Sequence, residues 1–118
     1  CRRTMLQEQF KQRHIHIRHD EKKGVIKMNN ELMERVCRTA IGKWGSRLQL
    51  IVAVEEMSEL TKEICKFNRG KADISAIAEE IADVSIMLEQ LKIIFGCADK
   101  VEEYIDYKIK RLSERIGE

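Results

Sequence analysis

The sequence contains no proline, little glycine and few aromatic residues. Six of its 118 residues are glycine, and phenylalanine, tryptophan and tyrosine together make up 5%. Sandwiches and barrels of short strands are rich in aromatic side chains, so this composition argues against them and favours long helices. Hydrophobic residues make up 43% of the chain, which is enough to build a core although 36% of the residues are charged. These values indicate a folded domain and exclude wholesale disorder.

The sequence also lacks long hydrophobic runs and paired cysteines. No apolar run approaches the roughly 18 residues that a membrane helix needs, and no charged segment followed by an apolar one suggests a signal peptide. The four cysteines are far apart and form no CxxC pair, so neither a zinc site nor a disulfide scaffold is expected. We therefore expect a cytoplasmic protein with reduced thiols and no membrane contact.

The charge of the chain is unevenly distributed. Residues 1–27 contain eight Lys/Arg and three Asp/Glu, for a net +5, whereas residues 28–118 contain fourteen and seventeen, for a net −3. An acidic folded part argues against nucleic acid as its partner. The change in composition predicts a basic N-terminal extension over 1–27, flexible or non-native, followed by one compact domain over 28–118.

Four helices are expected after the basic extension. Their predicted ranges are 30–42, 46–68, a third from Asp73 as N-cap to about residue 95, and 98–116, with Ser46 as the N-cap of the second. The short linkers predict antiparallel neighbours. The fold prediction is therefore an all-α four-helix bundle. Because a domain of about 90 residues cannot bury wide apolar stripes alone, we expect it to form oligomers through its helical faces.

Acidic residues lie on the apolar faces of the second and third predicted helices. On a helical wheel, Glu80 falls inside the apolar arc of the third helix and Asp83 on its edge, while Glu56 and Glu59 border the apolar arc of the second. If the two helices pair, the four carboxylates converge. Buried carboxylates need compensation, and oxygen-only clusters suit Mg²⁺ or Mn²⁺. The alternative is that these acids form ordinary solvated faces or salt bridges with lysine.

The two acidic segments, Glu55-Glu56-Met57-Ser58-Glu59 and Glu80-Ile81-Ala82-Asp83, resemble the EExxE…ExxD signature of MazG-like proteins. These proteins belong to the all-α nucleoside triphosphate pyrophosphohydrolases, and the resemblance covers about residues 30–116. It implies that Glu56, Glu59, Glu80 and Asp83 bind Mg²⁺, with Mn²⁺ as a possible substitute. It also implies hydrolysis of an NTP or dNTP, canonical or aberrant, to the monophosphate and pyrophosphate. It further implies a house-cleaning role in nucleotide metabolism and a homo-oligomer, either a dimer or a tetramer.

Further roles follow from the metal-assisted reaction and from the resemblance. Glu59 is the expected group that orients or deprotonates the attacking water, with Glu55 as its competitor. Lys108 and Arg111 match a KxxR-like pair that contacts phosphates in the family, although Asp106 stands where some relatives have asparagine. Other candidates are Lys66 for the phosphates and Trp44 and Gln49 for the base.

The sequence is also compatible with a different class of function. A short, highly charged helical protein with wide apolar stripes is also typical of a non-catalytic dimerisation or regulatory module. In that case the basic N-terminal segment would contact nucleic acid. Such a module has no reason to place Glu80 on its core face, which is the feature that distinguishes the two hypotheses.

Overall fold

The structure is a computed structural model that describes residues 22–71 and 73–118. The described residues form four helices and no strand: α2 (Lys22–Trp44), α3 (Ser46–Asn68), α4 (Ile74–Phe95) and α5 (Ala98–Ile116). The all-α prediction is confirmed. Within these ranges, no helix combines the length and the hydropathy needed to cross a bilayer.

The sequence signals explain most of the helix ends. Asp73 caps α4 as predicted, since its Oδ1 accepts a hydrogen bond of 3.1 Å from the Ala76 amide. α4 ends at Gly96, which has φ 59° and ψ 36°. This left-handed conformation favours glycine and lets the Cys97 amide bond to the Lys92 carbonyl at 3.0 Å.

Two helix starts differ from the prediction. α3 is preceded by Gly45 in the N-cap position, with φ 87°, and Ser46 is already helical. α2 begins at Lys22 rather than near residue 30. Residues 22–29 contain no proline, and their single glycine does not stop a helix. Most of the predicted extension, residues 1–21, lies outside the described residues.

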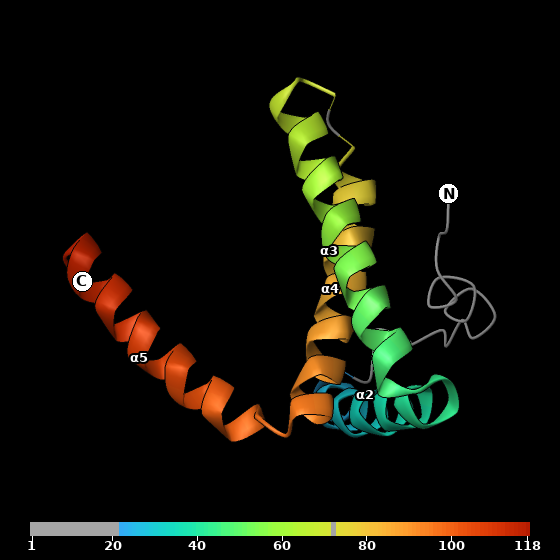
Figure 1. Cartoon of the computed structure of the whole chain (residues 1–118). Coiled ribbons are helices and arrows are strands. Elements are labelled where there is room, and N and C mark those ends of the chain that lie inside the picture. Colours follow the sequence, from blue (N-terminus) through green and yellow to red (C-terminus); the bar gives the residue numbers. More distant parts are fainter. Residues whose placement is uncertain (1–21, 72) are drawn as a thin grey trace.

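The helices α3 and α4 lie side by side, while α2 crosses their lower ends (Figure 1). A turn that begins at residues 69–71 connects α3 to α4 at their upper ends (Figure 1). At the lower end, the side chain of Gln49 near the start of α3 bonds to that of Gln90 near the end of α4. α5 leads away from the other three helices (Figure 1), and none of its residues is buried.

The interior of one copy is small and polar. Five hydrophobic side chains are buried among the described residues: Cys37, Ala40, Val52, Ala53 and Met87. Six buried side chains are polar or charged: Gln49, Glu56, Glu63, Glu80, Asp83 and Gln90. All six lie on α3 or α4. The contact between these two helices therefore buries more polar than apolar side chains.

Much of the apolar surface of α3 and α4 is exposed in one copy. On α4, Ile81 is 50% and Leu88 44% exposed, and on α3 Met57, Ile64 and Phe67 are exposed as well. This exposure agrees with the expectation that one copy cannot bury its wide apolar stripes alone. α5 leads away from the other helices and does not cover these residues (Figure 1).

Candidate metal centre

Three carboxylates from α3 and α4 meet between these two helices. One oxygen each from Glu56, Glu80 and Asp83 lies within 4.8 Å of the other two. Their side chains are almost completely removed from solvent, with exposed fractions of 2%, 2% and 6%. Glu80 and Asp83 stand one turn apart on α4, so both reach the same point of α3. The convergence of these three residues agrees with the sequence analysis.

The geometry and the donor type of this group fit a hard divalent cation. Mg²⁺ holds oxygen ligands at about 2.1 Å, which places opposite ligands about 4.2 Å apart and adjacent ones about 3 Å apart. The oxygen separations, all within 4.8 Å, are of the same order as these values. Three carboxylates with no sulfur or imidazole donor are a poor zinc site and a good site for Mg²⁺ or Mn²⁺. Glu56, Glu80 and Asp83 are therefore the residues that could hold such an ion.

The other two acids of the sequence signature lie at the margin of this group. Glu59 is half-buried on α3, one turn after Glu56, and is not among the three that converge. Glu55 is also half-buried. Their partial exposure leaves both accessible to water, which a proton acceptor in hydrolysis requires.

The acids continue into a line of buried polar side chains, which we call the polar seam: Gln49, Glu56, Glu63, Glu80, Asp83 and Gln90. On α3 its members recur every seven residues, as do Asp83 and Gln90 on α4, so each set follows one face of its helix. At one end of the seam, Gln49 Nε2 donates to Gln90 Oε1 at 2.6 Å. At the other end, Lys66 Nζ lies 3.2 Å from Glu63 Oε1.

Several residues predicted to bind substrate have other contacts in this copy. Gln49 is engaged with Gln90, and Lys66 is paired with Glu63. Trp44, the last residue of α2, is half-buried, and the Lys43 ammonium lies 5.4 Å from its ring centroid. A lysine over an indole is a cation–π contact that orients the ring.

The predicted phosphate ligands lie on α5, away from the carboxylates. Lys108 and Arg111 are exposed, and the Arg111 guanidinium lies 5.9 Å from the centroid of the Tyr107 ring. Because α5 diverges from α3 and α4 (Figure 1), one copy does not bring these cations to the acids.

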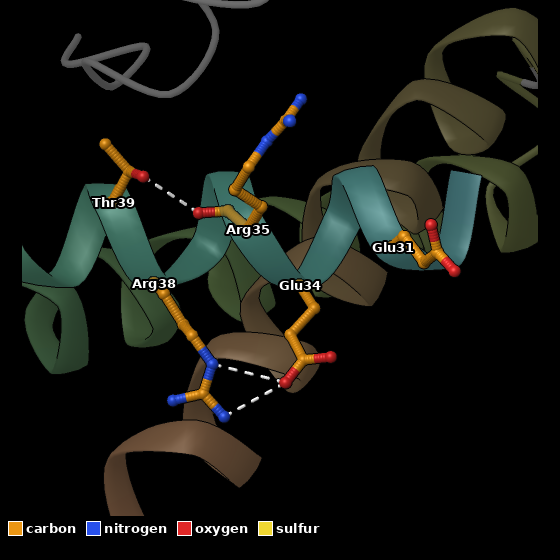
Figure 2. A pocket seen from close by; sticks show the side chains of 5 residues that line it. All are labelled: Glu31, Glu34, Arg35, Arg38 and Thr39. Carbon is orange, nitrogen blue, oxygen red and sulfur yellow. Dashed lines mark hydrogen bonds and ion pairs between the residues drawn. The ribbon is translucent and has the colours of Figure 1, made fainter. Parts of the chain in front are cut away.

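Two hollows on the surface lie outside the seam. One, of about 350 Å³, follows the outer face of α2 and is lined by Glu31, Glu34, Arg35, Arg38 and Thr39 (Figure 2). There Arg38 donates two hydrogen bonds of 3.0 and 3.2 Å to one oxygen of Glu34. The other hollow, of about 570 Å³, lies between α2, the end of α4 and the start of α5. Neither contains a predicted site residue, and the first is a solvated charged face.

A buried thiol packs behind the seam. Cys37 of α2 is 1% exposed, and its Sγ lies 3.9 Å from the carbonyl oxygen of Ile86 on α4. Burial raises the pKa of this thiol from 9.0 to about 11, and the negative charge of Glu89 adds to the effect. Cys37 therefore behaves as a small hydrophobic side chain and not as a nucleophile.

The sequence analysis missed one member of the seam, Gln90. Its position contains a usable signal, since Gln90 follows Asp83 by seven residues, as Glu63 follows Glu56. Residues seven apart share a helix face, so a search for polar residues in this register would have found it.

Comparisons with known proteins do not identify a relative of this chain. No protein-family model, no curated protein and no solved structure matches it. The chemistry proposed below is therefore supported by the buried carboxylates of α3 and α4 and by the sequence signature in which they stand.

Proposed function

We propose that this protein is a Mg²⁺-dependent nucleoside triphosphate pyrophosphohydrolase of the MazG-like type. The observation that carries the proposal is the meeting of Glu56, Glu80 and Asp83, three buried carboxylates with oxygens within 4.8 Å of one another. Buried like charges repel and lose hydration, so a protein that only needed stability would gain from apolar residues there. A site that holds a cation explains why they are present.

The overall reaction would be hydrolysis between the α- and β-phosphates. Water adds to phosphorus, the bond to the bridging oxygen breaks, and the products are a nucleoside monophosphate and pyrophosphate. Bound Mg²⁺ would neutralise charge on the triphosphate oxygens. Glu59, at the margin of the acids, takes the proton of the attacking water, and Glu55 is the alternative proton acceptor.

The proposal includes an oligomer built from antiparallel helix pairs. The exposed apolar residues of α3 and α4 need a cover, and the apolar residues of α5, among them Ile105, Ile109 and Leu112, are exposed too. A second copy can cover both surfaces, as closed dimers commonly do. Packing of α5 against another copy would also bring Lys108 and Arg111 toward that copy's carboxylates.

The decisive experiment is a product analysis with a panel of canonical and modified NTPs and dNTPs. We expect pyrophosphate release from at least one of them in the presence of Mg²⁺ or Mn²⁺, and no release after chelation with EDTA. Release of single phosphate, or full activity in excess EDTA, would contradict the proposal. The panel also identifies the base and the sugar.

The exposed apolar surfaces favour a second candidate, a non-catalytic dimerisation module. Such a protein would form the same oligomer but release no pyrophosphate from any substrate. It would also lose no function when Glu80 is replaced. The product analysis and the oligomeric mass together separate the two candidates.

A further inference from the structure

The polar seam places a hydrogen-bonded pair of amides at the end of the α3–α4 hairpin opposite its turn, the end that α2 crosses (Figure 1). Gln49 and Gln90 are each 1% exposed, and Gln49 Nε2 donates to Gln90 Oε1 at 2.6 Å. The turn that begins at residues 69–71 holds the other end, about 28 Å away along α3 at 1.5 Å per residue. The carboxylates of Glu56, Glu80 and Asp83 lie between these two attachments.

The contact in which the carboxylates lie has little apolar burial. Three buried acids lie within 4.8 Å of one another, where ionised neighbours repel, and the apolar core beside them consists of Val52, Ala53 and Met87, with Ile86 and Leu91 packed against it. Small apolar side chains such as Ala53 contribute little to holding two helices together. At the helix ends far from the turn, no covalent link joins α3 directly to α4, and the packing of α2 and the glutamine pair oppose their separation.

A buried hydrogen bond constrains the two helices more strictly than an apolar contact does. Apolar side chains tolerate sliding and rotation, whereas an amide pair keeps its bond only within a narrow range of distance and angle. Buried polar residues fix helix register in coiled coils for this reason. Gln49 and Gln90 stand seven residues from Glu56 and Asp83, about 10 Å along each helix, which is close enough to control how those acids meet.

We propose that Gln49 and Gln90 are positioning residues, which together with α2 hold the ends of α3 and α4 opposite the turn closed and keep the three carboxylates at ligand distance before a cation binds. The pair touches neither the ion nor the substrate. It acts through the relative placement of α3 and α4. This inference rests on the proposed function for its purpose, although the closure of the hairpin can be measured without any metal.

The test uses the full chain with Gln90→Met, which removes the acceptor while keeping the side-chain length. A buried Gln49 amide without its acceptor disfavours the closed end. In the metal-free protein we expect amide hydrogen exchange at Val52 and Ala53 to accelerate by about tenfold, which corresponds to about 1.4 kcal/mol. Exchange at Ile64, near the turn, should stay unchanged. Met87→Leu, an apolar exchange in the same contact, is the matched control and should alter neither site.

Metal binding provides the second measurement. Mn²⁺ affinity, titrated by electron paramagnetic resonance without nucleotide, should fall in Gln90→Met by the factor by which the closed, correctly oriented hairpin loses population. The double variant Gln49→Met/Gln90→Met removes the unsatisfied amide and should regain the unfolding free energy of the wild type. Its Mn²⁺ affinity should stay low, because two methionines do not fix the helix orientation.

The outcomes distinguish the positioning role of the two glutamines from the proposed function. Recovery of Mn²⁺ affinity together with stability in the double variant would overturn the positioning role, and so would uniform acceleration of exchange at Val52 and Ile64 in Gln90→Met. If wild-type protein binds Mn²⁺ no tighter than Glu80→Gln does, the proposed function fails. The exchange pattern then decides by itself whether the amide pair closes the hairpin.

Discussion

Replacing Glu80 by glutamine should abolish turnover without destabilising the metal-free protein. Glu80 is 2% exposed and lies within 4.8 Å of the carboxylates of Glu56 and Asp83. At an effective dielectric of about 20, two unit charges at that distance repel by about 3.5 kcal/mol. Glutamine keeps the shape and removes the charge, although it forfeits part of the hydrogen bonding of a carboxylate. We therefore expect the free energy of unfolding to stay equal or to rise by about 1–3 kcal/mol.

The assay is chemical unfolding of wild type and variant, each with and without Mg²⁺. A cation that binds only the folded state stabilises it by about 2.7 kcal/mol at a concentration of about 100 times its Kd. Wild type should show this gain and Glu80→Gln should show little of it. Glu79→Gln is the matched control, since Glu79 is the neighbouring exposed acid on the same helix. It removes the same charge but should retain both turnover and the response to Mg²⁺.

Two results would refute this reasoning. Strong destabilisation of the metal-free protein by Glu80→Gln would identify Glu80 as a structural partner whose charge the fold requires. Full activity of the variant would remove Glu80 from the catalytic site. In either case the three carboxylates would no longer support a metal-dependent hydrolase.

Three further predictions concern the thiol, the oligomer and α5. Because the folded-state pKa of Cys37, about 11, exceeds its ordinary value of 9.0, the folded protein binds more protons in this range. The unfolding free energy should therefore fall between pH 9 and 11, by at most about 2.7 kcal/mol, and Cys37→Ala should lack this component of the pH profile. Light scattering should give at least a dimeric mass, and Ile81→Glu should shift it toward the monomer; a monomeric wild type would contradict the oligomer. Lys108→Ala should lower kcat/KM by about 10- to 100-fold, as expected for a lost charge-assisted hydrogen bond, whereas Lys110→Ala, its exposed neighbour, should not.

Local signals in the sequence predicted most of the helices. Asp73 and Gly96 mark the two ends of α4, because side-chain caps and left-handed glycines act within a few residues. The first residues of α2 were missed, since the helix was predicted to begin near residue 30 and residues 22–29 are already helical. Helix propensity alone does not set a boundary where neither a cap nor a breaker is present.

Part of the acidic site could also be predicted from the sequence. Helical periodicity placed Glu80 and Asp83 toward the interior, and the structure brings them together with Glu56. Periodicity could not show that Glu59 stays outside this group, since that depends on the angle between two helices. For the same reason it could not reveal that α5 leaves the core residues of α4, such as Leu88, exposed in one copy.

One residue, Gly45, joins α2 to α3, so a small change of angle at this residue moves the far end of α2 by a large distance. Gly45 has φ 87° and ψ 149°, and a Cβ built on it would meet nothing within 4 Å, so the conformation and not the available space demands glycine. α2 has 23 residues and is therefore about 35 Å long. A rotation of about 10° at this joint displaces the far end of α2 by about 6 Å. Because glycine resists such rotation only weakly, the angle of α2 is set by what it packs against, which includes the contact of Cys37 with Ile86. Substitutions along that contact will therefore reorient the whole helix, whereas the same changes on its outer face will not.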